Sequence, residues 1–213
     1  MVLFVILLVF IALLAYTLGS VNTLIFAGRN IFHRSLYAYP FNNRGLTLFF
    51  KDAKRKELIL LAVSEIVRVG FPVLVGGWIM SSYDMPELGR AFAMFCLLMG
   101  QAFPLVYGFK GLPVTVAFLV ATVFVNIGLG LFCIVIFFAV YFVTRYISLS
   151  IIVAAFAAFV LSIIAIDAPL VTRMFLACAA IVLIDKRKNI VRLFKGKEPK
   201  FRYRKDISYM FDK

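Results

Sequence analysis

The strongest constraint on this sequence is a series of apolar runs that are long enough to cross a lipid bilayer. The first run covers residues 2 to about 26 and contains no charged residue, and a spanning helix needs roughly 20 apolar residues. A signal peptide would instead begin with basic residues and end in a small-residue cleavage site, and this run has neither. Hydrophobic residues make up 64% of the chain, against roughly 45–50% in a soluble domain. The sequence therefore predicts an all-α polytopic membrane protein.

Later apolar runs predict six more membrane spans, which gives seven transmembrane helices in total. The run from 112 to 143 is too long for one span, and Asn126, Gly128 and Gly130 indicate a break that divides it into two short helices. If that break is absent, the count falls to six or five. The other spans are expected at about 58–80, 89–107, 147–166 and 169–184.

Basic residues fall mainly on one side of this predicted topology. They are frequent in the loop 27–57 and in the tail after residue 184, whereas the opposite side carries only Arg90 and Arg173, beside acidic residues. Because cytoplasmic loops are enriched in Lys and Arg, we expect the N-terminus outside and the C-terminus in the cytoplasm. The expected organisation is one transmembrane domain at 1–184, with an interfacial cytoplasmic loop at 27–57, and a basic cytoplasmic tail at 185–213.

The charge and the reactive residue types limit the expected partners and cofactors. The net charge of +13 is segregated along the chain, which favours membrane lipids with anionic headgroups and phosphate-bearing substrates over nucleic acid. Cys96, Cys133 and Cys178 each lie inside an apolar run and are interpreted as buried hydrophobic residues without a disulfide or metal-ligand spacing. His33 is the only histidine. We expect no metal and no cofactor.

A polar stretch from Gly100 to Pro113 interrupts the apolar sequence between two predicted spans. It contains Gln101, several glycines and Lys110 as its only charge. Membrane chains tolerate such a break where protein or water satisfies the backbone, so it is either a plain reverse turn or a turn that lines a polar site.

Glu65 and Arg68 lie on one face of a predicted span. They either hold that helix in the bundle or form a wall of the same site. The expected topology places this turn, the interfacial loop and the tail on one cytoplasmic face.

Four short motifs occur in order along the chain. They are L-A-Y-T-L-G-S at 14–20, G-Q-A-F-P followed by G-F-K-G within 100–111, T-R-Y-I-S-L-S at 144–150, and an N-x-x-R-x-x-x-G-x-E pattern at 189–198. In this combination they resemble the bacterial acyl-phosphate:glycerol-3-phosphate acyltransferases, the PlsY family. The resemblance implies a seven-span enzyme of the bacterial cytoplasmic membrane. Such an enzyme moves an acyl group from acyl phosphate to glycerol 3-phosphate, which gives lysophosphatidic acid for phospholipid biosynthesis.

The resemblance also implies roles for individual residues. Glu65 and Arg68 are expected to support the site. The residues expected to take part in catalysis are Gln101, Lys110, Arg192 and Glu198. Those expected to bind substrate phosphates are Asn43, Gly45, Thr47, Lys51, Gly111 and Asn189.

The chain departs from the family pattern in the polar turn. Gln101 stands where the family has a histidine, and glutamine can form hydrogen bonds but cannot carry a positive charge. Leu112 and Pro113 replace part of a glycine-rich segment, whose backbone freedom suits a phosphate cradle. Two hypotheses stay open. One is a working acyltransferase in which the acceptor hydroxyl attacks the acyl phosphate without a covalent enzyme intermediate. The other is a catalytically inactive paralogue that binds lipid or a membrane partner.

Overall fold

The structure is a computed structural model that describes residues 2–21, 55–105 and 113–195. In this part of the chain all regular structure is helical, as predicted, and it forms seven helices. Their bounds are α1 Val2–Ser20, α4 Arg55–Ser81, α5 Pro86–Ala102, α6 Thr115–Val125, α7 Ile127–Thr144, α8 Ile147–Ala165 and α9 Pro169–Phe194.

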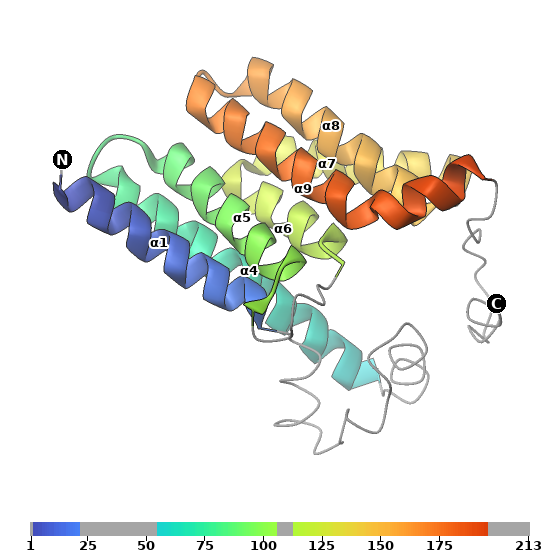
Figure 1. The fold of residues 1–213 in the computed structure, drawn as a ribbon, viewed down its shortest axis with the longest axis horizontal. Helices are drawn as coiled ribbons and strands as arrows, with labels where there is room; N and C mark the ends of the chain where they lie inside the picture. Colours follow the sequence, from blue (N-terminus) through green and yellow to red (C-terminus); the bar gives the residue numbers. More distant parts are fainter. Residues whose placement is uncertain (1, 22–54, 106–112, 196–213) are drawn as a thin grey trace.

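Helix α5 lies at the centre of the bundle and contacts α1, α4, α6 and α9 (Figure 1). Its amphipathic sequence explains this position, because small and apolar residues such as Ala91, Ala93 and Leu97 are fully buried along it. Helices α7 and α8 pack against each other and extend the bundle on the side of α9. The helices of the bundle run up and down, so that their ends gather at two opposite ends of the molecule.

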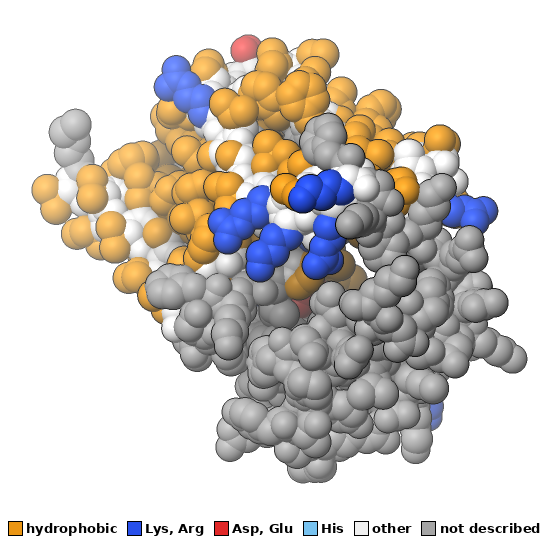
Figure 2. Space-filling view, turned by 45° about the vertical axis from the view of Figure 1, so that its right-hand side comes forward, with side chains coloured by type: hydrophobic (Ala, Val, Ile, Leu, Met, Phe, Trp, Pro, Cys, Tyr) orange, Lys and Arg blue, Asp and Glu red, His pale blue; other side chains and the backbone are white. Residues whose placement is uncertain are grey.

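The outer surface of the bundle is that of a membrane protein. Hydrophobic side chains cover much of the described surface (Figure 2), and they include large exposed residues such as Phe10, Phe71 and Phe142. Among the described helices, four are long and apolar enough to cross a membrane: Val2–Ser20, Ile59–Ser81, Ile127–Thr144 and Ile147–Ala165. At 1.5 Å per residue, the 11-residue α6 is only about 16 Å long, which is shorter than the roughly 30 Å hydrocarbon core.

The predicted break between two helices in the run 112–143 is confirmed. Asn126 has an extended backbone, and its side chain accepts a hydrogen bond from the backbone N–H of Leu129 at 3.0 Å. An asparagine in this position ends α6 and caps the start of α7, since its side-chain oxygen satisfies one of the free N–H groups of the new helix.

Two predicted element boundaries differ from the structure. The span expected at 89–107 is α5, which begins at Pro86 and ends at Ala102. The backbone N–H of Phe103 bonds to Met99 O at 2.9 Å, but Pro104 has no N–H with which to continue the helix. At the other boundary, α9 continues ten residues past its apolar part at 169–184, to Phe194. The first part of the basic tail is therefore helical.

Helix α1 packs very closely on α5 at two glycines. A Cβ atom added to Gly19 would lie 2.2 Å from Leu97 O, and one added to Gly100 would lie 2.2 Å from Tyr16 O. Only glycine allows backbones to approach this closely. These two contacts fix the end of α1 against the end of α5, where the polar turn begins.

The close contact at Gly19 predicts a loss of stability on substitution. Gly19→Ala should lower the free energy of unfolding by about 1–3 kcal/mol, the usual cost of forcing extra volume into a packed core. Gly128→Ala is the matched control, because the nearest atom to its added Cβ is Asn126 Oδ1 at 3.5 Å. Thermal unfolding of both variants in detergent micelles measures the difference. Equal unfolding midpoints for the two variants would show that the α1–α5 contact is not as close as described.

Candidate active site

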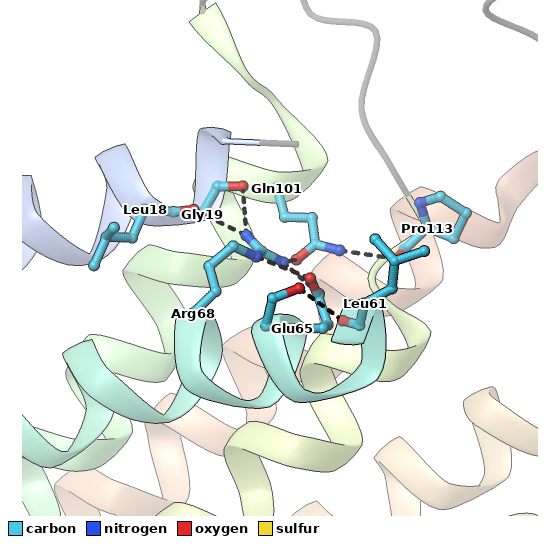
Figure 3. A network of polar contacts seen from close by, with 8 residues as sticks. Leu18, Gly19, Leu61, Glu65, Arg68, Gln101 and Pro113 are labelled. Atoms are coloured by element: carbon cyan, nitrogen blue, oxygen red, sulfur yellow. Dashed lines mark hydrogen bonds and ion pairs between the residues drawn. The ribbon is translucent and has the colours of Figure 1, made fainter. Parts of the chain in front are cut away.

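The candidate site lies where α1 and α5 end and α6 begins, beside the middle of α4. Polar contacts join these helix ends across the bundle, from Leu18 and Gly19 through Arg68 and Gln101 to Pro113 (Figure 3). The last carbonyls of a helix lack partners within the helix, so a buried helix end needs donors from elsewhere. Here the donor is a side chain from a neighbouring helix.

Arg68 of α4 is at the centre of these contacts. Its side chain is only 7% exposed. Nε donates to Glu65 Oε2 at 3.0 Å, and Nη1 donates to Leu18 O at 2.9 Å and Gly19 O at 3.1 Å. Nη2 donates to Glu65 Oε1 and, at 2.9 Å, to Gln101 Oε1. These contacts use all five N–H donors of the guanidinium group. The sequence left open whether the Glu65–Arg68 pair holds the helix or borders a site. The geometry shows that it ties α4 to α1 and to the first residues of the polar turn.

Gln101 connects the two ends of the polar turn. It is 4% exposed, its Oε1 accepts from Arg68, and its Nε2 donates to Pro113 O at 3.0 Å. A primary amide can accept and donate at the same time, and both functions are used here. Gln101 therefore holds the start of the turn, at the end of α5, next to the residues that precede α6 (Figure 3).

Two hydroxyl groups of α1 also hold this end of α5, and the residue-by-residue roles predicted from the sequence did not include them. Tyr16 Oη donates to Phe103 O at 2.7 Å, and the single O–H of Ser20 is shared between Tyr16 O at 2.9 Å and Gly100 O at 3.3 Å. Both residues lie in the L-A-Y-T-L-G-S motif, and that motif was the only sequence signal that could have pointed to them.

The basic end of α9 contributes a second group of polar residues. Asn189 Nδ2 donates to Ser148 Oγ at 2.6 Å, which joins α9 to the first turn of α8. Arg192 is exposed and lines an open hollow of about 480 Å³ together with Arg187, Lys188, Val191 and Lys195.

The neighbouring Lys186, in contrast, is buried and forms an ion pair with Asp185 at 2.8 Å. Asp185 also lies 3.5 Å from the backbone N of Val114, so α9 reaches the start of α6.

Of the predicted site residues, the structure brings Glu65, Arg68 and Gln101 into direct contact. It places Asn189 and Arg192 on the last turns of α9. The remaining predicted residues lie outside the described residues: Asn43, Gly45, Thr47, Lys51, Lys110, Gly111 and Glu198. Across residues 2–21, 55–105 and 113–195, no three His, Cys, Asp or Glu side chains are grouped so that they could hold a metal ion.

Comparison with known proteins identifies the family. Residues 9–196 match the family model described as glycerol-3-phosphate acyltransferase, so the chain belongs to this family of membrane acyltransferases. The glycerol-3-phosphate acyltransferase of Staphylococcus haemolyticus is 28% identical over 196 residues, which cover 90% of this chain and 96% of that protein. The corresponding protein of Macrococcus caseolyticus is 26% identical over 193 residues, which cover 91% of this chain and 96% of that protein.

The fold is shared with solved structures of PlsY, an integral membrane glycerol 3-phosphate acyltransferase. Its lysophosphatidic acid form superimposes with a TM-score of 0.73 at 23% sequence identity, covering 92% of this chain and 95% of that one. Its glycerol 3-phosphate form gives 0.71 at 22% identity, covering 96% and 99%. The predicted family and the prediction of a multi-pass membrane acyltransferase are therefore confirmed.

The contacts of Gln101 predict the effect of removing its amide. Gln101→Leu would leave one N–H of buried Arg68 and the carbonyl of Pro113 without this partner. Because an unsatisfied buried polar group costs about 1–3 kcal/mol, the free energy of unfolding should fall by at least that amount. Ser81→Ala is the control, since the exposed Ser81 hydroxyl bonds only locally, to Trp78 O, and it should unfold close to the wild type. Chemical unfolding in detergent micelles measures both. A Gln101→Leu variant as stable as the wild type would contradict the bridging role.

Tyr16 provides a narrower test of how the turn is positioned. Tyr16→Phe removes only the hydroxyl that donates to Phe103 O, which should cost about 1 kcal/mol of stability and lower the turnover number. Thr17→Val is the matched control on the same helix, because the Thr17 hydroxyl donates within α1 to Leu13 O and Leu14 O. Unfolding midpoints and initial rates of both variants measure the effect. If both variants lose activity equally, the Tyr16–Phe103 contact has no special part in positioning the turn.

Proposed function

We propose that this protein transfers an acyl group from acyl phosphate to glycerol 3-phosphate. The observation that carries the proposal is the match of residues 9–196 to the glycerol-3-phosphate acyltransferase family. Two further observations support it: the relatives bear that name over nearly their whole length, and buried contacts hold the polar turn that contains one of the family's motifs. Phosphates on both substrates suit the cationic end of the bundle, because guanidinium and ammonium groups bind phosphate oxygens.

In the proposed reaction, a hydroxyl oxygen of glycerol 3-phosphate attacks the carbonyl carbon of the acyl phosphate. The new ester bond forms between that oxygen and the carbonyl carbon, and the bond from the carbonyl carbon to the phosphate oxygen breaks. The hydroxyl proton leaves with the departing phosphate, so the products are lysophosphatidic acid and inorganic phosphate. This reaction needs no covalent enzyme intermediate, metal or cofactor, and the protein contributes through positioning and charge stabilisation.

We assign the following roles. Arg192 and Asn189, on the last turns of α9, bind phosphate oxygens from one side of the site, and Gln101 orients the polar turn that carries Lys110 and Gly111. The Glu65–Arg68 pair supports Gln101. The remaining proposed ligands of the two phosphates are Asn43, Gly45, Thr47 and Lys51, and Glu198 is assigned to orienting the substrates.

The proposed topology has seven spans, with the N-terminus outside and the C-terminus in the cytoplasm. It is supported by the described helix ends, because the ends that border 22–54 and 106–112 lie at the same end of the bundle as the end of α9. The segments that these ends border and the sequence after residue 184 contain most of the Lys and Arg residues of the chain, and such an excess is typical of the cytoplasmic side. In this topology α6 counts as one of the seven membrane spans, although it is short.

The decisive experiment uses the purified full-length protein with acyl phosphate and glycerol 3-phosphate. Inorganic phosphate and lysophosphatidic acid should form in equal amounts, and neither should form when glycerol 3-phosphate is omitted. If no product forms at high protein concentration, while a family member with the full glycine-rich segment is active in the same assay, the proposed reaction is wrong for this chain. The paralogue hypothesis would then replace it.

Arg192 is the described residue on which the proposed phosphate site depends most directly. Arg192→Ala should lower kcat/KM by at least about 100-fold, the size of effect seen when a group that stabilises transition-state charge is removed. Arg173→Ala is the matched control, since Arg173 is an exposed arginine at the opposite end of the same helix. Initial rates of phosphate release measure both variants. Unchanged turnover in Arg192→Ala would remove Arg192 from the site.

A further inference from the structure

The exposed face of α9 changes from apolar to basic along one continuous helix. Leu176, Leu183 and Ile184 are 51%, 46% and 46% exposed, as expected of side chains that face lipid. Arg187 and Val191 continue the same face, because residues three and four apart lie one above the other on a helix. The basic end of the helix is therefore a direct extension of its lipid-facing surface.

Three cations cluster on this extension, which we call the basic face: Arg187, Lys188 and Lys195. Arg192, assigned above to the substrate phosphates, lies beside them. With Val191 they line the open hollow of about 480 Å³. Asp185, the acidic residue next to them in the sequence, pairs instead with Lys186 and faces the start of α6. Figure 2 shows a group of Lys and Arg side chains bordered by hydrophobic ones on the described surface. The hollow thus combines a positive charge with an apolar border.

In the proposed seven-span topology, in which α9 crosses the membrane, the basic face begins at the depth of the lipid headgroups. At 1.5 Å per residue, Arg187 lies about 4.5 Å beyond Ile184 along the helix axis, and Lys195 lies about 16 Å beyond it. The headgroup layer on each side of the hydrocarbon core is roughly 5–7 Å thick. Helical side chains tilt back toward the N-terminus, and long basic side chains extend to reach the interface. Several of these cations can therefore reach lipid phosphates.

We propose that the basic face binds the phosphate groups of anionic membrane lipids in the leaflet at this end of the bundle. This interaction is separate from acyl transfer, because the diacyl lipids concerned are neither substrate nor product of the proposed reaction. Clusters of Lys and Arg directly beyond a membrane span are attracted to anionic headgroups. The hollow accepts the phosphate among the cations, and the apolar surface at Ile184 contacts the adjoining acyl chain.

The test is a lipid titration of the purified full-length protein by native mass spectrometry, with dioctanoyl phosphatidylglycerol and dioctanoyl phosphatidylcholine as probes and no substrate present. The triple variant R187Q/K188Q/K195Q keeps Arg192 and should bind phosphatidylglycerol about tenfold or more weakly, because each lost cation near the surface weakens the attraction. Binding of phosphatidylcholine should not change. Since the assay contains no substrate, its outcome is independent of whether the protein transfers acyl groups.

Two control variants and one competitor make the outcome decisive. The charge-keeping variant R187K/K188R/K195R should retain phosphatidylglycerol binding, as should R173Q at the other end of α9. Millimolar inorganic phosphate should not displace the lipid. Wild-type affinity in the triple variant, an equal loss in R173Q, or displacement by free phosphate would each overturn the proposal. If circular dichroism shows that the triple variant is misfolded, the single variants K188Q and K195Q replace it, and wild-type affinity in both would overturn the proposal equally.

Discussion

The described end of the bundle depends on one buried cation, the guanidinium group of Arg68. Removing such a charge from water costs several kcal/mol unless every donor finds a partner, and here all five N–H donors do. The partners come from three helices: Glu65 on α4, the last carbonyls of α1, and Gln101 on α5. Because the helix C-terminus of α1 carries partial negative charge, Arg68 also compensates a dipole that would otherwise be buried. If α1 or α5 moved away from α4 here, the Arg68 guanidinium would lose hydrogen-bond partners.

This dependence explains why the two described ends of the polar turn lie together although its sequence departs from the family pattern. A histidine at position 101, if protonated, would place a second cation next to Arg68, whereas the amide of Gln101 accepts from Arg68 and donates to Pro113. Pro113 has no N–H to offer, and its carbonyl is the group that Gln101 uses. Every residue type has a backbone carbonyl, so this hydrogen bond tolerates the proline at position 113 but does not require it. Gln101 thus fixes the two ends of the turn relative to each other, and fixed positions are what a reaction driven by positioning needs.

Much of the fold could be predicted from the sequence, because apolar length and turn residues determine where membrane helices form. Asn126 was a usable signal since it both ends one helix and caps the next. The end of α5 was placed too late, because hydropathy continues to Tyr107 while the hydrogen-bond pattern stops at Pro104. The helical part of the basic tail was not distinguished from the rest of the tail, since its charges interrupt the apolar pattern that defined the spans.

The candidate site was less predictable, because its contacts join residues that are distant in the sequence. The spacing of Glu65 and Arg68 indicated a pair on one helix face, but no local pattern could show that Gln101 would be the next partner. Tyr16 and Ser20 belong to a recognisable motif, but the sequence could not show their hydrogen bonds, because the acceptor carbonyls lie some eighty positions away. Lys186 was counted among the tail cations, yet it is buried against Asp185 while its neighbours Arg187 and Lys188 are exposed. Adjacent cations on one helix thus have different roles. The direction in which each one points follows from the packing of α9 against α5 and α8, and it decides which cation stabilises the bundle and which can bind a phosphate.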